Sequence, residues 1–188
     1  MDTTAGDLLE EGRRRLRAAN DRFGHTGFER SDAGDLMRHV LGRVPGDDEE
    51  VDGVARRRYE RLIARRATGE PLPYIVGWTE FRGLRLSVRP GTFVPRETTE
   101  FLAAQAIRRV RGRPESVVID LATGVGSGAL AAAAAVPTAC VYGVDLARTA
   151  VGTARRNARA NSTRTNSRAP RVFAFQASKT SARTRSVG

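Results

Sequence analysis

The chain has 188 residues, of which 40% are hydrophobic, so it is long and apolar enough for one ordinary domain with a core and a small extra unit. Its single cysteine, Cys140, excludes a disulfide framework, and the cytoplasm is therefore the expected compartment. Nine arginines, one lysine and no acidic residue follow Asp145, so most of the formal net charge of +11 lies there, which argues against a nucleic-acid-binding surface over the whole protein.

A signal peptide, a membrane span and a metal site are not expected. Acidic residues precede any apolar run at the N-terminus: Asp7, Glu10 and Glu11. Residues 121–144 carry no charge, but their glycines, threonines and Pro137 favour a buried strand-helix-strand unit over a membrane helix. The two histidines, His25 and His39, are far apart and have no neighbouring ligand residues, so no metal site is predicted.

Residues 1–68 are predicted to form a small helical domain. Apolar side chains recur at helical spacing over residues 5–23, between Ser31 and Gly42, and over residues 54–67. Ser31 is a suitable N-cap for the second helix, and Gly42 is a suitable residue to end it.

Residues 69–95 are predicted to form a β-hairpin that links this helical domain to the main domain. Glycines and prolines separate two β-type runs, residues 74–76 and residues 84–88. Apolar and polar side chains alternate in the second run, which is typical of a half-buried strand. A helix is then predicted from Thr98 to Val110, with this apolar face: Phe101, Leu102, Ala106 and Ile107.

The main domain is organised around residues 116–145. A short apolar run ends on Asp120, and a glycine-bearing loop and an alanine-rich helix follow as far as Pro137. A second β-type run ends on Asp145. Glycine loops let backbone N–H groups approach a ligand closely, and a carboxylate at the end of the second strand can accept hydrogen bonds from ribose hydroxyls. The stretch therefore predicts a nucleotide-type cofactor site.

Four segments of the chain carry a resemblance to a known family: RRATGEPLPYIVGWTEFRGLRLSVRPGTFVPRETTE (Arg65 to Glu100), DAGDLMRHVLG (Asp32 to Gly42), DLATGVG (Asp120 to Gly126) and VDLARTAVGTARRNARAN (Val144 to Asn161). In the right order, they resemble segments of the HemK-type methyltransferases. These enzymes transfer a methyl group from S-adenosylmethionine to the glutamine side-chain amide of peptide chain release factors. The GEP-YI-G segment together with PRETTE is the most specific part of this resemblance.

The resemblance implies an α/β fold with four parts. A helical domain (residues 1–68) and a linking hairpin (residues 69–95) precede the first part of a Rossmann-like class I methyltransferase domain, residues 96–161, with an incomplete sheet. The basic tail, residues 162–188, is expected to be disordered and to contribute little to stability, although residues 171–176 could add a third strand.

The resemblance also implies which residues bind S-adenosylmethionine. The loop from Ala122 to Gly126 would contact the methionine and ribose parts, Asp145 would hold the ribose hydroxyls, and Asp120 would lie beside the loop. The predicted cofactor-binding residues are Asp120, Ala122, Thr123, Gly124, Val125, Gly126 and Asp145. Ala122 and Val125 depart from the family's DLGTGSG pattern, and the Ala122 methyl group would crowd the cofactor if that position needs a positive φ.

No catalytic residue is assigned, because the family's Asn-Pro-Pro-Tyr motif occurs nowhere in this chain. The hypothesis for this absence is a truncation or frameshift near Asn161. Arginine outnumbers lysine 31 to 1, as expected of a GC-rich gene in which an altered frame often yields Arg, Ala, Ser and Thr.

Methyl transfer to a release factor, in a catalytically impaired form, is thus the leading interpretation. A second is a related methyltransferase that acts on another protein or on a small molecule. A third is a non-enzymatic fragment whose basic tail binds nucleic acid weakly, and a fourth is an ordinary α/β domain in which the glycine loop is only a tight turn.

Overall fold

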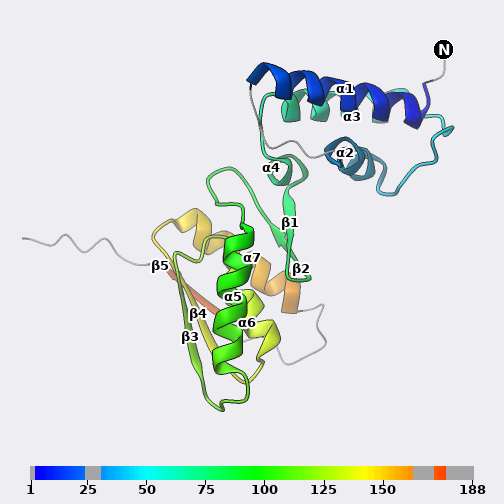
Figure 1. Ribbon diagram of the computed structural model, residues 1–188. Coiled ribbons are helices and arrows are strands. Elements are labelled where there is room, and N and C mark those ends of the chain that lie inside the picture. Colours follow the sequence, from blue (N-terminus) through cyan, green and yellow to red (C-terminus); the bar gives the residue numbers. More distant parts are fainter. Residues whose placement is uncertain (1–2, 24–30, 163–171, 177–188) are drawn as a thin grey trace, which may run out of the picture. The chain divides into compact units, whose positions relative to one another are not determined.

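The computed structural model describes residues 3–23, 31–162 and 172–176. The chain divides into two compact units, Met1–Val76 and Gly77–Gly188, and each has its own architecture (Figure 1).

The first unit consists of helices (Figure 1). They are α1 (Ala5–Phe23), α2 (Asp32–Leu41), α3 (Gly53–Ala67) and the short α4 (Leu72–Val76). The three longer helices confirm the sequence prediction in number and position. Their ends follow local chemistry: the Asp52 carboxylate accepts the N–H groups of Val54 and Ala55 to start α3, and Gly42 ends α2 with a φ of 73°. Ser31 stands before α2 as predicted, but its side chain makes no capping hydrogen bond.

The core of the first unit is apolar, with one buried ion pair beside it. The core residues are Leu8, Leu16, Ala33, Leu36, Met37, Tyr59, Leu62, Ile63 and Ile75. The Arg66 Nε donates to Asp32 Oδ2 at 2.8 Å, and both side chains are buried. Arg66 also donates from Nη1 to the Glu70 carbonyl, so this ion pair connects α2, α3 and the segment that leads to α4.

The predicted β-type run at residues 74–76 is wrong, because these residues form the end of α4. The Pro71 carbonyl accepts the N–H of Tyr74, which starts a helical turn, and Ile75 is buried in the core of the helical unit. Burial of Ile75 against the helices therefore outweighs the local β preference. Gly77, with a φ of 83°, then directs the chain into the hairpin.

The hairpin belongs to the second unit, and its first strand begins at Trp78, four residues later than the predicted start at Tyr74. Strand β1 (Trp78–Phe81) pairs antiparallel with β2 (Leu84–Ser87), and Arg82 and Gly83 form the turn with positive φ. The predicted alternation in the second strand is confirmed, since Leu84 and Leu86 are buried and Arg85 is exposed.

A parallel sheet forms the centre of the second unit. Its order is β3 (Val117–Leu121), β4 (Cys140–Asp145) and β5 (Val172–Gln176). Helix α6 (Ser127–Ala135) connects β3 to β4, and α7 (Arg148–Ser162) follows β4 in the segment that leads to β5. Both connections step in the same direction across the sheet, so right-handed crossovers place the two helices on one face. Helix α5 (Glu97–Val110) packs against α6 (Figure 1). The predicted α/β fold with a partial Rossmann-like sheet is confirmed.

The two faces of this sheet differ sharply in exposure. Val141 lies on the helix-covered face and is fully buried. On the opposite face, three side chains of β3 are exposed: Val117 at 58%, Ile119 at 60% and Leu121 at 74%. Parallel pairing places Cys140, Tyr142 and Val144 beside these three residues, in the same order. Within the described residues, one face of the sheet thus lacks a covering layer.

The predicted apolar face of α5 is wrong in part. In α5, Ala103 and Ile107 are buried, whereas the predicted core residues Phe101 and Leu102 are 67% and 66% exposed, because the helix buries the face that carries Ala103 and Ile107. In the tail, residues 172–176 form β5, the third strand that the sequence analysis left open beside disorder, because the outer edge of β4 offers unpaired backbone groups to an apolar run. The remaining tail from residue 163 onward, and the predicted nucleic-acid-binding role with it, lies outside the described residues.

Candidate functional site

The glycine loop lies at the carboxyl ends of β3 and β4, where ligands of open parallel sheets bind. It begins at Ala122, directly after β3, and ends where Ser127 starts α6. Three of its residues have left-handed backbone angles: Ala122 with a φ of 57°, Gly124 with 58° and Gly126 with 88°. The loop is therefore a tight, specifically shaped turn that opens the N-terminus of α6.

Asp120 stabilises this loop from within. Its Oδ2 accepts the Thr123 hydroxyl at 2.6 Å and the Ala129 N–H at 3.0 Å. Two glycines make these contacts possible, because an added Cβ at Gly128 would lie 3.1 Å from Asp120 Oδ2, and one at Gly143 would lie 2.9 Å from Thr123 Oγ1. Asp120 thus has the architectural place that the resemblance implies, and its carboxylate is engaged by the loop itself.

Asp145 approaches the loop from the end of β4. Its Oδ2 accepts the Gly124 N–H at 2.9 Å, and its Oδ1 accepts the Ala147 N–H at 2.9 Å. The Val144 carbonyl also accepts the Thr123 N–H, at 3.0 Å. The predicted proximity of Asp145 to the loop across 21 residues of sequence is therefore present in the fold.

The loop residues face in two directions. Val125 is fully buried, and Thr123 and Gly126 are also buried, so these residues are directed into the protein. Ala122 is exposed, and a Cβ added at Gly124 would have no heavy atom within 4 Å, so open space lies beside that glycine. Of the seven predicted residues, Ala122, Gly124 and Asp145 are thus best placed to meet a ligand.

The Val125 side chain is not available to a ligand, in contrast to the predicted contact. The Val125 carbonyl oxygen is also occupied, because it accepts a hydrogen bond from Asn157 Nδ2 at 2.9 Å. The sequence analysis did not identify Asn157. The available signal was the recurrence of Thr153, Asn157 and Asn161 every fourth residue on the otherwise apolar face of α7.

Other kinds of site are not supported in the described part of the chain. Residues 3–23, 31–162 and 172–176 contain no group of three or more His, Cys, Asp or Glu side chains that could hold a metal ion. No helix among these residues is long and apolar enough to cross a membrane.

Two protein-family models match the chain. The model described as the PrmC N-terminal domain covers residues 7–77, and the model of ribosomal protein L11 methyltransferase (PrmA) covers residues 96–182. The first match coincides closely with the helical unit, and the second contains the glycine loop, Asp120 and Asp145.

Curated relatives are methyltransferases. The release factor glutamine methyltransferase of Burkholderia pseudomallei is 39% identical over 133 residues, which are 68% of this chain and 47% of that protein. The release factor glutamine methyltransferase of Streptomyces coelicolor is 41% identical over 131 residues, which are 68% of this chain and 47% of that protein. The 4-amino-L-phenylalanine/4-methylamino-L-phenylalanine methyltransferase of Streptomyces pristinaespiralis is 38% identical over 141 residues, which are 72% of this chain and 48% of that protein.

The chain thus spans about half the length of the curated relatives that it matches. Among solved structures, the crystal structure of TrmN from Thermus thermophilus aligns with 78% of this chain and 52% of that chain, at 22% identity and a TM-score of 0.35.

Proposed function

We propose that this chain contains the S-adenosylmethionine-binding part of a methyltransferase related to the release factor glutamine methyltransferases. The proposal is supported by its similarity to these enzymes over about half of their length. One observation carries this proposal: the Asp145 carboxylate meets the Gly124 N–H at 2.9 Å, beside a loop with open space at that glycine.

The described residues fit such a cofactor. Asp145 uses one lone pair of each carboxylate oxygen for Gly124 and Ala147, and a carboxylate has about four acceptor positions, so capacity remains for a ribose diol. The missing side chain at Gly124 allows the methionine part to lie close to the backbone. S-adenosylmethionine, when bound, supplies an electrophilic methyl group.

The contribution of this chain to methyl transfer is binding and orientation. Asp120 binds Thr123 and Asp145 binds Gly124, so the loop is held in one conformation before the ligand arrives. Ala122 restricts the room on the exposed side, because its methyl group projects from a left-handed backbone position. The chemistry on the acceptor is left to residues outside this set, since no Asn-Pro-Pro-Tyr motif is present.

The proposed methyl acceptor is the glutamine side chain of a peptide chain release factor, as the names of the relatives indicate. A small aromatic amine is the second candidate, because the relative named as the 4-amino-L-phenylalanine methyltransferase is nearly as similar, at 38% identity.

Calorimetric titration of S-adenosylhomocysteine into the chain tests cofactor binding. Binding with one site per chain is expected, and no heat at ligand concentrations up to about 1 mM, the range of a free energy near −4 kcal/mol, would contradict the proposal. A version completed with a family-like C-terminal half would then be assayed on a release factor and on 4-amino-L-phenylalanine, and its preference decides between the two acceptors.

A further inference from the structure

Helix α7 carries a row of buried polar side chains. Thr153 and Asn157 are fully buried, and Asn161 is nearly so, and the three are four residues apart. Buried polar side chains are costly without hydrogen-bond partners, so the partners of this row show what the helix is built to hold.

The partners lie on β2 and the residue pair that follows it. Thr153 Oγ1 accepts Arg89 Nε at 3.1 Å, and Asn161 Nδ2 donates to the Arg85 carbonyl at 3.2 Å. Between them, Asn157 makes two bonds to Ser87: its Oδ1 accepts the N–H at 2.8 Å and its Nδ2 donates to the carbonyl at 3.1 Å.

The spacing of the two elements explains why this row is continuous. Four residues of α-helix rise about 6 Å, and two residues of strand rise about 6.6 Å, so each step along α7 matches a two-residue step along β2. The hairpin therefore docks on α7 in a defined register.

Asn157 differs from its neighbours in the row because it also reaches the glycine loop. Its Nδ2 donates to the Val125 carbonyl at 2.9 Å, so the side-chain amide uses both donors and one acceptor position. The Asn157 side chain thus joins its own helix, α7, to two distant segments. The loop residue Val125 is 32 residues away in the sequence, and the β2 residue Ser87 is 70 residues away.

We propose that Asn157 is a positioning residue for the cofactor loop, and that it links docking of the hairpin to cofactor affinity. By holding the Val125 carbonyl inward, Asn157 fixes the peptide between the two left-handed glycines, Gly124 and Gly126. The Gly124 N–H is then directed at Asp145, as the site requires. This inference rests on the proposed cofactor function of the loop.

The test compares Asn157→Asp and Asn157→Ala with Thr153→Val. Asn157→Asp keeps the size and an acceptor for the Ser87 N–H, but it places a carboxylate oxygen against the Val125 carbonyl. Thr153→Val is the matched control, because it removes an equally buried polar group of the same row whose bonds go to Arg89 and to Thr149 of its own helix. All measurements are made well below the unfolding temperature of each variant.

Two readouts are needed. The first is amide hydrogen exchange of residues 122–126 in the ligand-free chain, which should be faster in both Asn157 variants and unchanged in Thr153→Val. The second is calorimetric titration with S-adenosylhomocysteine, in which the Asn157 variants should bind about two- to tenfold more weakly, the effect of losing one net hydrogen bond.

Two other outcomes overturn the proposal. Equal changes in the Asn157 variants and in Thr153→Val would show that the whole row acts on general stability. Loss of the folded circular dichroism spectrum in both Asn157 variants, with Thr153→Val still folded, would make Asn157 a structural residue only. If the parent chain does not bind S-adenosylhomocysteine, the proposed cofactor function fails, while the ligand-free exchange measurement still decides whether Asn157 positions the loop.

Discussion

At the scale of single residues, the two strand-end aspartates have different tasks. Asp120 directs one oxygen to Thr123 and Ala129, inside the loop, and so maintains its shape. Asp145 accepts backbone N–H groups from Gly124 and Ala147, and its two oxygens keep acceptor positions that the proposed cofactor would use. This difference makes Asp145 the residue whose charge should matter most for cofactor affinity.

Asp145→Asn should weaken binding of S-adenosylhomocysteine by roughly 1.5–3 kcal/mol, about ten- to a hundredfold, because hydrogen bonds from ribose hydroxyls to a charged acceptor are lost. Calorimetric titration of the version completed with a family-like C-terminal half measures this change. Asp21→Asn, at an exposed position of α1, is the control for the loss of one negative charge. Equal affinity of Asp145→Asn and its parent would remove Asp145 from the site.

Ala122 has a φ of 57°, a region that costs a residue with a Cβ about 1–2 kcal/mol. Ala122→Gly should therefore raise the free energy of unfolding by up to about 1 kcal/mol, after allowance for the greater entropy of glycine in the unfolded chain. Ala104→Gly, within α5, should lower it by about 1 kcal/mol. Urea unfolding of the two variants checks these opposite signs, and a shared sign would mean that the loop is not strained at Ala122.

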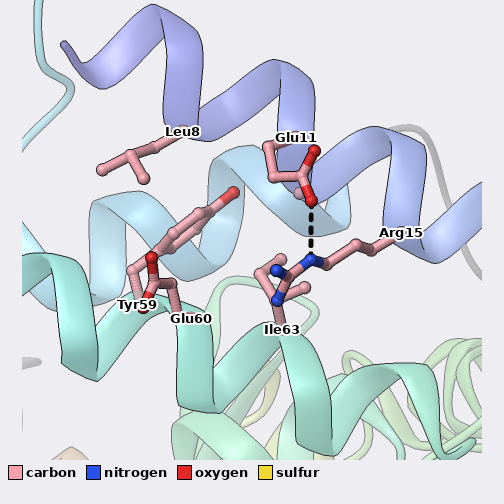
Figure 2. Close-up of a pocket in the computed structure, with 7 residues that line it drawn as sticks. Leu8, Glu11, Arg15, Tyr59, Glu60 and Ile63 are labelled. Carbon is pink, nitrogen blue, oxygen red and sulfur yellow. Dashed lines mark hydrogen bonds and ion pairs between the residues drawn. The ribbon is translucent and has the colours of Figure 1, made fainter. Parts of the chain in front are cut away.

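At the scale of elements, the contact of α1 with α3 depends on one glycine. Figure 2 shows Tyr59 of α3 directed toward α1, near Leu8 and Glu11. A Cβ at Gly12 would lie 2.3 Å from the Tyr59 hydroxyl oxygen, which is buried and makes no hydrogen bond to the described residues. Burial raises the pKa of the Tyr59 hydroxyl above its ordinary value. The Tyr59 side chain therefore fits against α1 because residue 12 has no side chain.

Gly12→Ala should destabilise the helical unit by about 1–3 kcal/mol, because the added methyl group must displace Tyr59 from a packed position. Gly34→Ala is the matched control within α2, where an added Cβ has no heavy atom within 4 Å, and it should stabilise the unit by up to about 1 kcal/mol. Thermal unfolding followed by circular dichroism separates the two. A stable Gly12→Ala variant would indicate that α1 and α3 pack less closely than described.

The edge strand β5 should contribute measurably to stability. It pairs with β4 at five register positions, from Val141 with Val172 to Asp145 with Gln176, and it contacts α7. Deletion of residues 163–188 should therefore lower the unfolding midpoint by roughly 5 °C or more, whereas deletion of residues 177–188 should leave it nearly unchanged. Equal midpoints of the two shortened chains would restore the sequence-based expectation that the whole tail contributes little.

At the scale of the whole molecule, the sheet has one covered and one uncovered face among the described residues. The chain spans about half the length of its curated relatives, and parallel sheets are normally covered on both faces. Exposed side chains on β3 form an apolar row, residues Val117, Ile119 and Leu121. Such a row favours self-association of the chain in solution.

Ile119→Lys should reduce self-association and change the free energy of unfolding by less than about 0.5 kcal/mol, because this side chain is already 60% exposed. Val141→Lys, on the covered face of the neighbouring strand, should abolish folding, since it buries an unpaired charge. Light scattering against concentration and urea unfolding measure the two effects. Strong destabilisation by Ile119→Lys would mean that the exposed face is covered after all.

The amino-acid sequence by itself determined most elements and the outline of the site. Helical periodicity placed α1 and α2, and the order of strand, glycine loop, helix and strand placed Asp120 and Asp145 at neighbouring strand ends. These features could be predicted because they depend on residues close together in the chain. The proximity of Gly124 to Asp145 also follows, because parallel neighbouring strands end at the same edge of the sheet.

Only the tertiary structure decided features that depend on distant partners. Ile75 lies in a helix because the helical core buries it, and Phe101 and Leu102 are exposed because α5 buries the face that carries Ala103 and Ile107 instead. Asn157 is an ordinary polar helix residue in the sequence, and its place at the junction of α7, β2 and the loop requires segments up to 70 residues away. Burial and hydrogen bonding depend on which segments meet in space, and local pattern does not contain that information.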